Sequence, residues 1–208
     1  MRVFIIGSRG GLGQSIVSLL EQNKIQVVSL SSKEMDLKKL VALDQDTQFD
    51  GFIHCAGVNE LSPYEKVTRE TARPIMEVNT FSFIELCAQI NFSQKPNIIA
   101  IGSIYSTQTK ENRVQYTMAK HALYGAVKTL AIEMAPAKVN LVSPGFVDTA
   151  LTRKNNTLMR LRELEEKTPL GLTSAQDIAE MCLYLMTKNN CITGQNIIID
   201  SGYSLIGV

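Results

Sequence analysis

The chain has 208 residues, a hydrophobic content of 45% and a formal net charge of +1, from 21 Lys and Arg against 20 Asp and Glu. These values are typical of one globular domain with a substantial core, so we expect a single domain over residues 1–208. The balanced charge argues against a nucleic-acid partner, and no stretch approaches the ~18 consecutive apolar residues of a membrane-spanning helix.

The apolar run Val3–Ile6 is too short for the core of a signal peptide, so we expect a cytoplasmic protein without a membrane partner. The 4 cysteines are scattered without the spacing of metal ligands, and only His54 and His121 are available to join them. We therefore expect no metal site and interpret the cysteines as reduced packing residues.

Short apolar runs alternate with helical patterns along the whole chain. The runs that we predict as strands are Val3–Ile6, Ile25–Leu30, Phe52–Cys55, Ile98–Ile101, Val139–Val142 and Ile197–Ile199. This alternation predicts an α/β fold, a doubly wound parallel sheet with helices on both faces.

A cluster of glycines follows the first predicted strand, at Gly7, Gly11 and Gly13. The apolar spacing from Leu12 to Leu20 predicts a helix that starts within this cluster and ends near Asn23. A strand, a tight turn and a helix start present free backbone amides and the positive end of the helix dipole to a phosphate. A plain flexible turn is the alternative, but the position between strand and helix favours a dinucleotide site.

The segment after the second predicted strand is short. Only Ser31 to Gly51 remain before the next strand, too few for two crossover helices with a full strand between them. We expect a helix to be missing, with Met35–Leu37 as a rudimentary strand and one short helix near Lys38–Leu43.

Tyr116 and Lys120 lie four residues apart in a stretch whose apolar spacing predicts a helix as far as Met134, so they share one helix face. A free phenol has a pKa of about 10, and an adjacent ammonium lowers it toward working pH. Ser103 directly follows a predicted strand, where its hydroxyl is suited to hold a carbonyl oxygen.

A further helix is expected over Ile178–Leu185, capped by Thr173 or Ser174.

In combination, these motifs resemble the short-chain dehydrogenase/reductase family, in its compact single-domain branch. That family carries a Ser, a Tyr-x-x-x-Lys and an N-terminal Gly-x-x-x-Gly-x-Gly on a Rossmann-type fold. The resemblance covers nearly the whole chain and includes, in order, His54-Cys55-Ala56-Gly57 in place of the usual Asn-Asn-Ala-Gly, then Val78-Asn79-Thr80, residues 140–149, residues 192–195 and residues 197–202.

The resemblance implies hydride transfer between a nicotinamide and a small-molecule carbonyl or secondary alcohol. Tyr116 would move the proton and Ser103 would hold the carbonyl oxygen. Lys120 would support the phenolate and contact the ribose, and Asn79 would hold a water that continues the proton path. His54 has no such implied role, and we interpret it as a strand-end residue.

The resemblance also assigns the cofactor-binding residues, which are Gly7, Ser8, Arg9, Gly11, Leu12, Gly13, Ser31, Ser32, Asp36, Leu37, Ala56, Gly57, Tyr116, Lys120, Pro144, Gly145, Val147 and Thr149. An NAD site commonly has an acid at the end of the second strand, but this chain has Ser31-Ser32-Lys33 there and Arg9 in the glycine loop. NADP(H) is therefore favoured over NAD(H). Asp36 also fits the pattern of a helix N-cap.

Family resemblance further implies that Leu151–Lys167 forms a mobile helix or lid over the substrate, and that the protein is a homodimer or homotetramer. Two other functions remain open. One is a catalytically silent dinucleotide sensor or scaffold. The other is a nucleotide-sugar epimerase or dehydratase, which usually needs more chain than the roughly sixty residues after Pro144. Tyr105, the region around Arg113 and the segment Leu151–Lys167 are expected around the substrate, whose identity and direction of conversion stay open.

Overall fold

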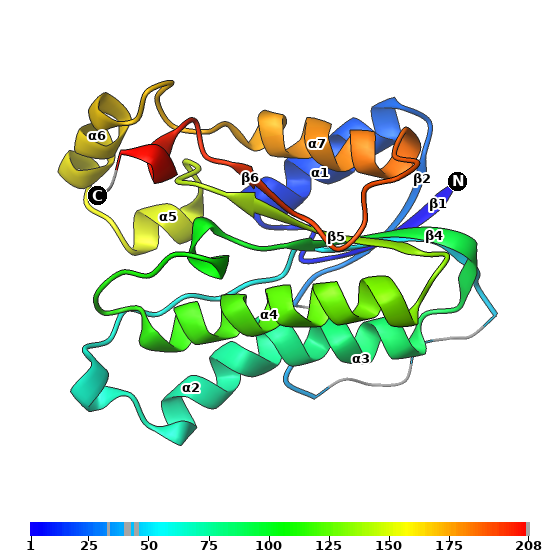
Figure 1. The fold of residues 1–208 in the computed structure, drawn as a ribbon, viewed down its shortest axis with the longest axis horizontal. Helices are drawn as coiled ribbons and strands as arrows, with labels where there is room; N and C mark the ends of the chain where they lie inside the picture. The colour runs from blue at the N-terminus through cyan, green and yellow to red at the C-terminus, as the bar shows by residue number, and fades with distance from the viewer. Residues whose placement is uncertain (33, 40–42, 44–45, 207–208) are drawn as a thin grey trace.

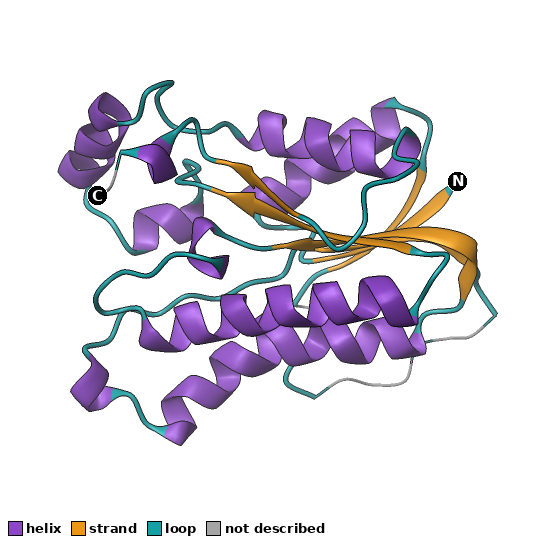
Figure 2. Ribbon diagram, viewed as in Figure 1, coloured by secondary structure: helices purple, strands orange, loops and turns teal. Residues whose placement is uncertain are grey.

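The computed structural model describes residues 1–32, 34–39, 43 and 46–206, which fold around one six-stranded sheet (Figures 1 and 2). The strands are β1 (Arg2–Ile6), β2 (Gln26–Leu30), β3 (Phe49–His54), β4 (Phe92–Ile101), β5 (Lys138–Pro144) and β6 (Asn196–Ile199). Their order is β2-β1-β3-β4-β5-β6, and every pairing is parallel. The predicted α/β class and all six of its main strands are confirmed.

Helices cover both faces of the sheet (Figure 1). On one face lie α1 (Gly11–Gln22) and α7 (Ala175–Thr187), which pack against each other. On the other lie α2 (Arg69–Met76), α3 (Ser82–Gln89) and α4 (Val114–Glu133). The predicted end of α1 and the predicted start of α7 are confirmed. Asn23 is the C-cap of α1, and Ser174 caps the start of α7 through reciprocal hydrogen bonds with Asp177.

Helix α4 carries two of the predicted site residues on its buried face. That face includes Tyr116, Lys120, Leu123 and Val127, at the spacing of one side of a helix. Leu123 is completely buried among the side chains of β3, β4 and α3. The packing of this residue therefore helps to set the position of Tyr116 and Lys120 over the sheet.

The segment after β2 differs from expectation, because Met35–Leu37 forms no strand. Its backbone makes successive turns instead, with Met35 N–H donating to the Ser31 carbonyl at 3.0 Å and Lys38 N–H donating to Asp36 Oδ1 at 3.0 Å. Turn hydrogen bonds thus replace pairing along β2. The helix expected near Lys38–Leu43 falls mostly outside the described residues, and Lys38 itself lies in a turn.

The 151–167 segment forms two helices and not one, α5 (Ala150–Lys154) and α6 (Leu158–Lys167), beyond the carboxyl ends of the strands (Figure 1). Each starts at a threonine whose side chain accepts a backbone hydrogen bond, Thr149 and Thr157. The mobility of this segment stays a prediction. Over the described residues, no helix combines the length and apolar character needed to cross a membrane.

Replacing Leu123 by alanine tests the packing of α4. We expect a loss of about 2–5 kcal/mol in the free energy of unfolding, because the buried side chain leaves a cavity in the core. Ile132→Ala, on the same helix but at a position 79% exposed, should change it by no more than about 0.5 kcal/mol. Urea unfolding followed by circular dichroism measures both, and equal losses would contradict the packing described.

Candidate active site

The carboxyl ends of the strands border two adjoining cavities. One, of about 220 Å³, is lined by Ser103, Tyr116 and Lys120 together with the start of α1 and residues 144–152. The other, of about 410 Å³, lies beside the end of β2 and the turn that follows it. Gly10, Cys55, Ala56 and Gly57 line both, so the two form one continuous site along this edge.

The glycine loop between β1 and α1 is held in close backbone contact. Gly7 has a φ of +85°, and a Cβ there would lie 2.5 Å from the amide nitrogen of Ala56. A Cβ on Gly13 would overlap the carbonyl oxygen of Gly7. No side chain caps the start of α1, where Gly10 is the N-cap residue, so the first amides of the helix are available to an anion.

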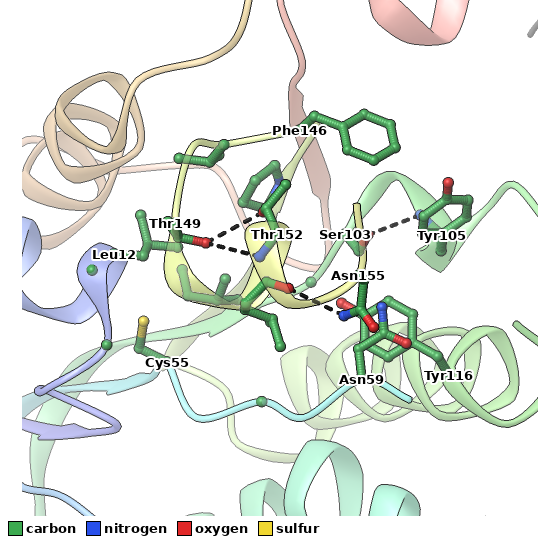
Figure 3. A pocket seen from close by; sticks show the side chains of 18 of the residues that line it. Leu12, Cys55, Asn59, Ser103, Tyr105, Tyr116, Phe146, Thr149, Thr152 and Asn155 are labelled. Atoms are coloured by element: carbon green, nitrogen blue, oxygen red, sulfur yellow. Dashed lines mark hydrogen bonds between the residues drawn. The ribbon is translucent and has the colours of Figure 1, made fainter. Parts of the chain in front are cut away.

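Ser103 and Tyr116 come from different elements and meet in the smaller cavity. Ser103 follows β4, and its Oγ accepts a hydrogen bond from the Tyr105 amide at 3.2 Å. Tyr116 lies in the first turn of α4, and its phenol is close enough to Ser103 for that side chain to lower its pKa. In Figure 3, Tyr105 and Tyr116 lie toward one side of the cavity, and Leu12 and Thr149 toward the other.

Burial dominates the electrostatics of the phenol. It raises the pKa of Tyr116 to about 12, while the nearby Ser103 side chain and the charge of Arg113 act in the opposite direction. The phenol therefore keeps its proton near neutral pH. In this form the group is a proton donor.

Lys120 is 2% exposed, and its Nζ donates a hydrogen bond to the Ile101 carbonyl at 2.8 Å. Burial lowers the pKa of Lys120 to about 8, and Cys55 opposes this shift. The pKa of the phenol is raised and not lowered as expected, because burial dominates it. Lys120 Nζ lies 5.7 Å from the centroid of the Tyr116 ring and donates its hydrogen bond to the end of β4.

Asn79 lies in a widened, π-helical turn, Glu77–Phe81, between α2 and α3. Its Nδ2 donates to the carbonyls of Val58 at 2.9 Å and Ile75 at 2.8 Å. Its Oδ1 is buried without a partner among the described residues, near Gly57. A Cβ on Gly57 would lie 3.1 Å from this oxygen and 3.7 Å from Lys120 Nζ.

At the other end of the site, Arg9 Nη2 pairs with Glu34 Oε1 at 2.8 Å. The second oxygen of Glu34 accepts hydrogen bonds from the amide of Ser31, at 2.7 Å, and from its hydroxyl. These bonds from Ser31 lower the pKa of Glu34. Glu34 is a residue that sequence reasoning missed, because the turn that returns it to the end of β2 leaves no periodic pattern.

The predicted cofactor and catalytic residues are distributed over both cavities. The smaller one is lined by Gly11, Leu12, Gly13, Ala56, Gly57, Ser103, Tyr116, Lys120, Pro144, Gly145, Val147 and Thr149, and the larger one by Gly7, Arg9, Ser31, Ser32, Asp36, Leu37, Ala56 and Gly57. Ser8 and Asn79 are not among the residues that line either cavity. Asn59, which no motif indicated, lines the smaller cavity.

His54 lies outside both linings. It is completely buried, its Nε2 lies 2.8 Å from Ser82 Oγ, and burial together with the charge of Lys120 lowers its pKa to about 3. The neutral His54 side chain connects the end of β3 to α3 through its contact with Ser82. This agrees with its interpretation as a strand-end residue.

The chain is similar in sequence and in structure to known proteins over nearly its whole length. A family model described as enoyl-(acyl carrier protein) reductase matches residues 31–204. A 3-oxoacyl-[acyl-carrier-protein] reductase of Buchnera aphidicola is 25% identical over 98% of this chain and 97% of its own length, and an L-xylulose reductase of Cavia porcellus is 26% identical over 97% and 96%. The crystal structure of a short chain dehydrogenase family protein from Francisella tularensis is 26% identical, with a TM-score of 0.85 and 98% of each chain covered.

The chain belongs to the short-chain dehydrogenase/reductase family. It is accordingly an NAD(P)-dependent oxidoreductase of that family. The residues present fit the cofactor, because close backbone contacts leave no room for a Cβ at Gly7 or Gly13 and the start of α1 is uncapped at the junction of the two cavities. A pyrophosphate is suited to that junction.

The buried ammonium of Lys120 gives a prediction about pH. The folded-state pKa of Lys120 is about 8, against an ordinary value of 10.5. Between pH 8 and pH 10.5 the unfolded chain therefore binds more protons than the folded chain. The destabilising effect of the buried charge is complete below pH 8 and is relieved as the pH rises. The free energy of unfolding of the wild type, minus that of Lys120→Met, should therefore rise by up to ~3 kcal/mol from pH 8 to 10.5.

Urea unfolding at a series of pH values measures this difference. Lys128→Met, which removes an exposed lysine from the same helix, serves as the control. A constant difference between wild type and Lys120→Met over this range would show that the ammonium is not desolvated in solution.

Proposed function

We propose that the protein transfers hydride between a nicotinamide and a carbonyl or secondary-alcohol carbon, with Tyr116 as the acid or base. The observation that supports this most is that Ser103, Tyr116 and Lys120 line one cavity, with Ser103 close enough to the phenol to lower its pKa. Two hydroxyls on one side of a pocket are suited to hold a single carbonyl oxygen. The family membership supplies the cofactor class for the same pocket.

In the reducing direction, the carbonyl carbon would receive a hydride from a nicotinamide bound in the same cavity. Ser103 holds the carbonyl oxygen, and Tyr116 donates its proton to that oxygen as the alcohol forms. Because its pKa is raised to about 12, Tyr116 starts the reaction protonated near neutral pH. A protonated phenol can donate its proton to a carbonyl oxygen, so the free enzyme is in the protonation state that carbonyl reduction requires.

Lys120 and Asn79 are proposed to return the proton to Tyr116. The Lys120 ammonium lies beside the phenol ring, and the buried Oδ1 of Asn79 faces the same region near Gly57. A water between this oxygen and Lys120 would have polar partners on both sides. The hydrogen bond from Lys120 to Ile101 holds the ammonium in position for this transfer.

We further propose that NADP(H) is preferred to NAD(H). Arg9 is among the residues that line the larger cavity, with Ser31 and Ser32, whereas Glu34 is not. The ion pair between Arg9 and Glu34 is largely exposed, and such pairs contribute only about 0–1 kcal/mol. A 2′-phosphate that contacts Arg9 would therefore displace Glu34 at little cost.

As for organisation, we propose one NAD(P)-binding domain that works in the cytoplasm as a homodimer or homotetramer. Val114 and Met118 on α4 are 47% and 46% exposed, four residues apart on one helix face. Apolar side chains in this arrangement are suited to contact a second copy of the chain.

The decisive test of the chemistry is Tyr116→Phe in a turnover screen with NADPH and NADH over ketones, aldehydes, keto acids, sugar phosphates, keto-esters and sugars. Loss of the phenolic proton should lower kcat by about 10²–10⁴ while cofactor affinity, followed by NADPH fluorescence, stays within a factor of about three. Tyr124→Phe removes a hydroxyl on the same helix outside both cavities and should keep full activity. Full activity of Tyr116→Phe would refute the mechanism, and cofactor binding with no turnover of any substrate would favour the silent sensor.

The cofactor preference is tested at Arg9. Arg9→Ala should weaken NADPH binding about tenfold and leave NADH binding nearly unchanged, because only the 2′-phosphate loses a partner. Glu34→Gln should strengthen NADPH binding, since it removes a competing carboxylate from Arg9. Arg73→Ala, which breaks an exposed pair with Glu77 on α2, is the matched control. Equal effects of Arg9→Ala on the two cofactors would contradict the preference.

A further inference from the structure

Arg113 is a buried charge in the active-site cavity for which the proposed reaction has no use. The residue is 6% exposed, directly precedes α4, and lines the cavity that contains Ser103 and Tyr116. Across the described part of the chain, no carboxylate forms an ion pair with its guanidinium. Buried charges are normally paired, so an unpaired one in a cleft indicates a ligand of opposite charge.

The charges around Arg113 add to this positive field. Lys110 lies close enough to Arg113 and Arg160 for both to lower its pKa, in addition to the effect of burial. The acids nearby do not balance these groups. Glu163 already binds Arg160 Nη1 at 2.7 Å and Lys167 Nζ at 2.8 Å, and Glu111 raises the pKa of Lys110 less than the two arginines lower it.

Aromatic side chains hold the guanidinium in place. The Arg113 Cζ lies 4.9 Å from the centroid of the Tyr105 ring, a cation–π contact that fixes the guanidinium against one ring face. The hydroxyls of Tyr105 and Tyr203 are buried without a hydrogen-bond partner among the described residues. An oxyanion that reaches this cluster would find a positioned guanidinium and hydroxyl donors beside it.

The distance from this cluster to the reacting groups is short. The Tyr105 ring that contacts Arg113 also makes an edge-to-face contact with Tyr116, at 6.3 Å between ring centroids. Arg113 precedes Tyr116 by three residues, and its charge acts on the phenol. A ligand held by both Arg113 and the Ser103–Tyr116 pair therefore has its anionic group within a few bonds of its carbonyl.

We propose that the substrate is a small carbonyl compound, or the corresponding alcohol, that carries an oxyanion, either a carboxylate or a phosphate. Arg113 binds that oxyanion while Ser103 and Tyr116 hold the reacting oxygen. This assignment rests on the carbonyl chemistry proposed above and adds a substrate class to it. Neutral sugars and esters lack the group that the guanidinium needs, and they are poor substrates on this view.

The test compares matched pairs of substrates, acetoacetate with methyl acetoacetate and dihydroxyacetone phosphate with dihydroxyacetone. The wild type should prefer the anionic member of at least one pair by about tenfold or more in kcat/KM, and the pair that shows the preference distinguishes carboxylate from phosphate. Arg113→Gln should abolish the preference, mainly through a higher KM for the anionic member. Arg113→Lys, which keeps the charge without the planar fork, should retain part of it.

Lys128→Gln is the matched control. Lys128, like Arg113, makes a cation–π contact with a tyrosine, at 4.8 Å from the centroid of the Tyr124 ring, but it lies outside the cavity. It should leave the preference unchanged. Thermal unfolding of each variant confirms that it is folded. A preference of the wild type for neutral members, or an unchanged preference in Arg113→Gln, would overturn the proposal.

Calorimetric titration of acetoacetate and of inorganic phosphate into the enzyme saturated with NADP⁺ separates this proposal from the proposed function, since no turnover is possible in that complex. Binding of either probe that is lost in Arg113→Gln supports the oxyanion site even if no carbonyl compound is turned over. Turnover that depends on Tyr116, without any effect of Arg113, would overturn the oxyanion site and leave the proposed function standing.

Discussion

The buried ammonium of Lys120 is joined to the last carbonyl of β4 by a hydrogen bond of 2.8 Å, and the geometry of the site depends on this contact. It connects α4 to the sheet at the point where the strand ends. Tyr116 lies one turn earlier in α4, and Ser103 lies two residues after the bonded carbonyl, so the same contact brings the two hydroxyls together. Burying an ammonium is costly, and a charged hydrogen bond to a carbonyl offsets part of that cost.

The parallel sheet explains why groups so distant in sequence share one edge. Strands β1, β3, β4 and β5 all deliver their following loops to the same side, which places Gly7, Ala56, Ser103 and Pro144 along one continuous site. Both Tyr116 and Lys120 are almost completely buried at this edge. Exclusion of water, more than any single neighbouring charge, accounts for the directions in which their pKa values move.

Local patterns in the sequence were sufficient to predict the sheet, the start and end of α1 and the cap of α7. Each depends on residues close together in the chain, such as the apolar runs or the pairing of Ser174 with Asp177. Met35–Leu37 was predicted wrongly as a strand, because its turn hydrogen bonds to Ser31 and Asp36 compete with strand pairing and leave no periodic signature. The pairing of Glu34 with Arg9, the burial of Arg113 and the carbonyl partner of Lys120 depend on contacts between distant elements, which spacing alone does not encode.

The short connection between β2 and β3 has a consequence for protein engineering. Strand β2 forms one margin of the sheet, and the turns that follow it contribute to the larger cavity without touching the groups beside Tyr116. On the proposed function, the residues that would select the cofactor lie toward the β2 end of this continuous site, and those that would perform the reaction follow β4 and lie in α4. If that proposal is correct, a loop of different length and charge after β2 would change cofactor use and leave Ser103, Tyr116 and Lys120 in place.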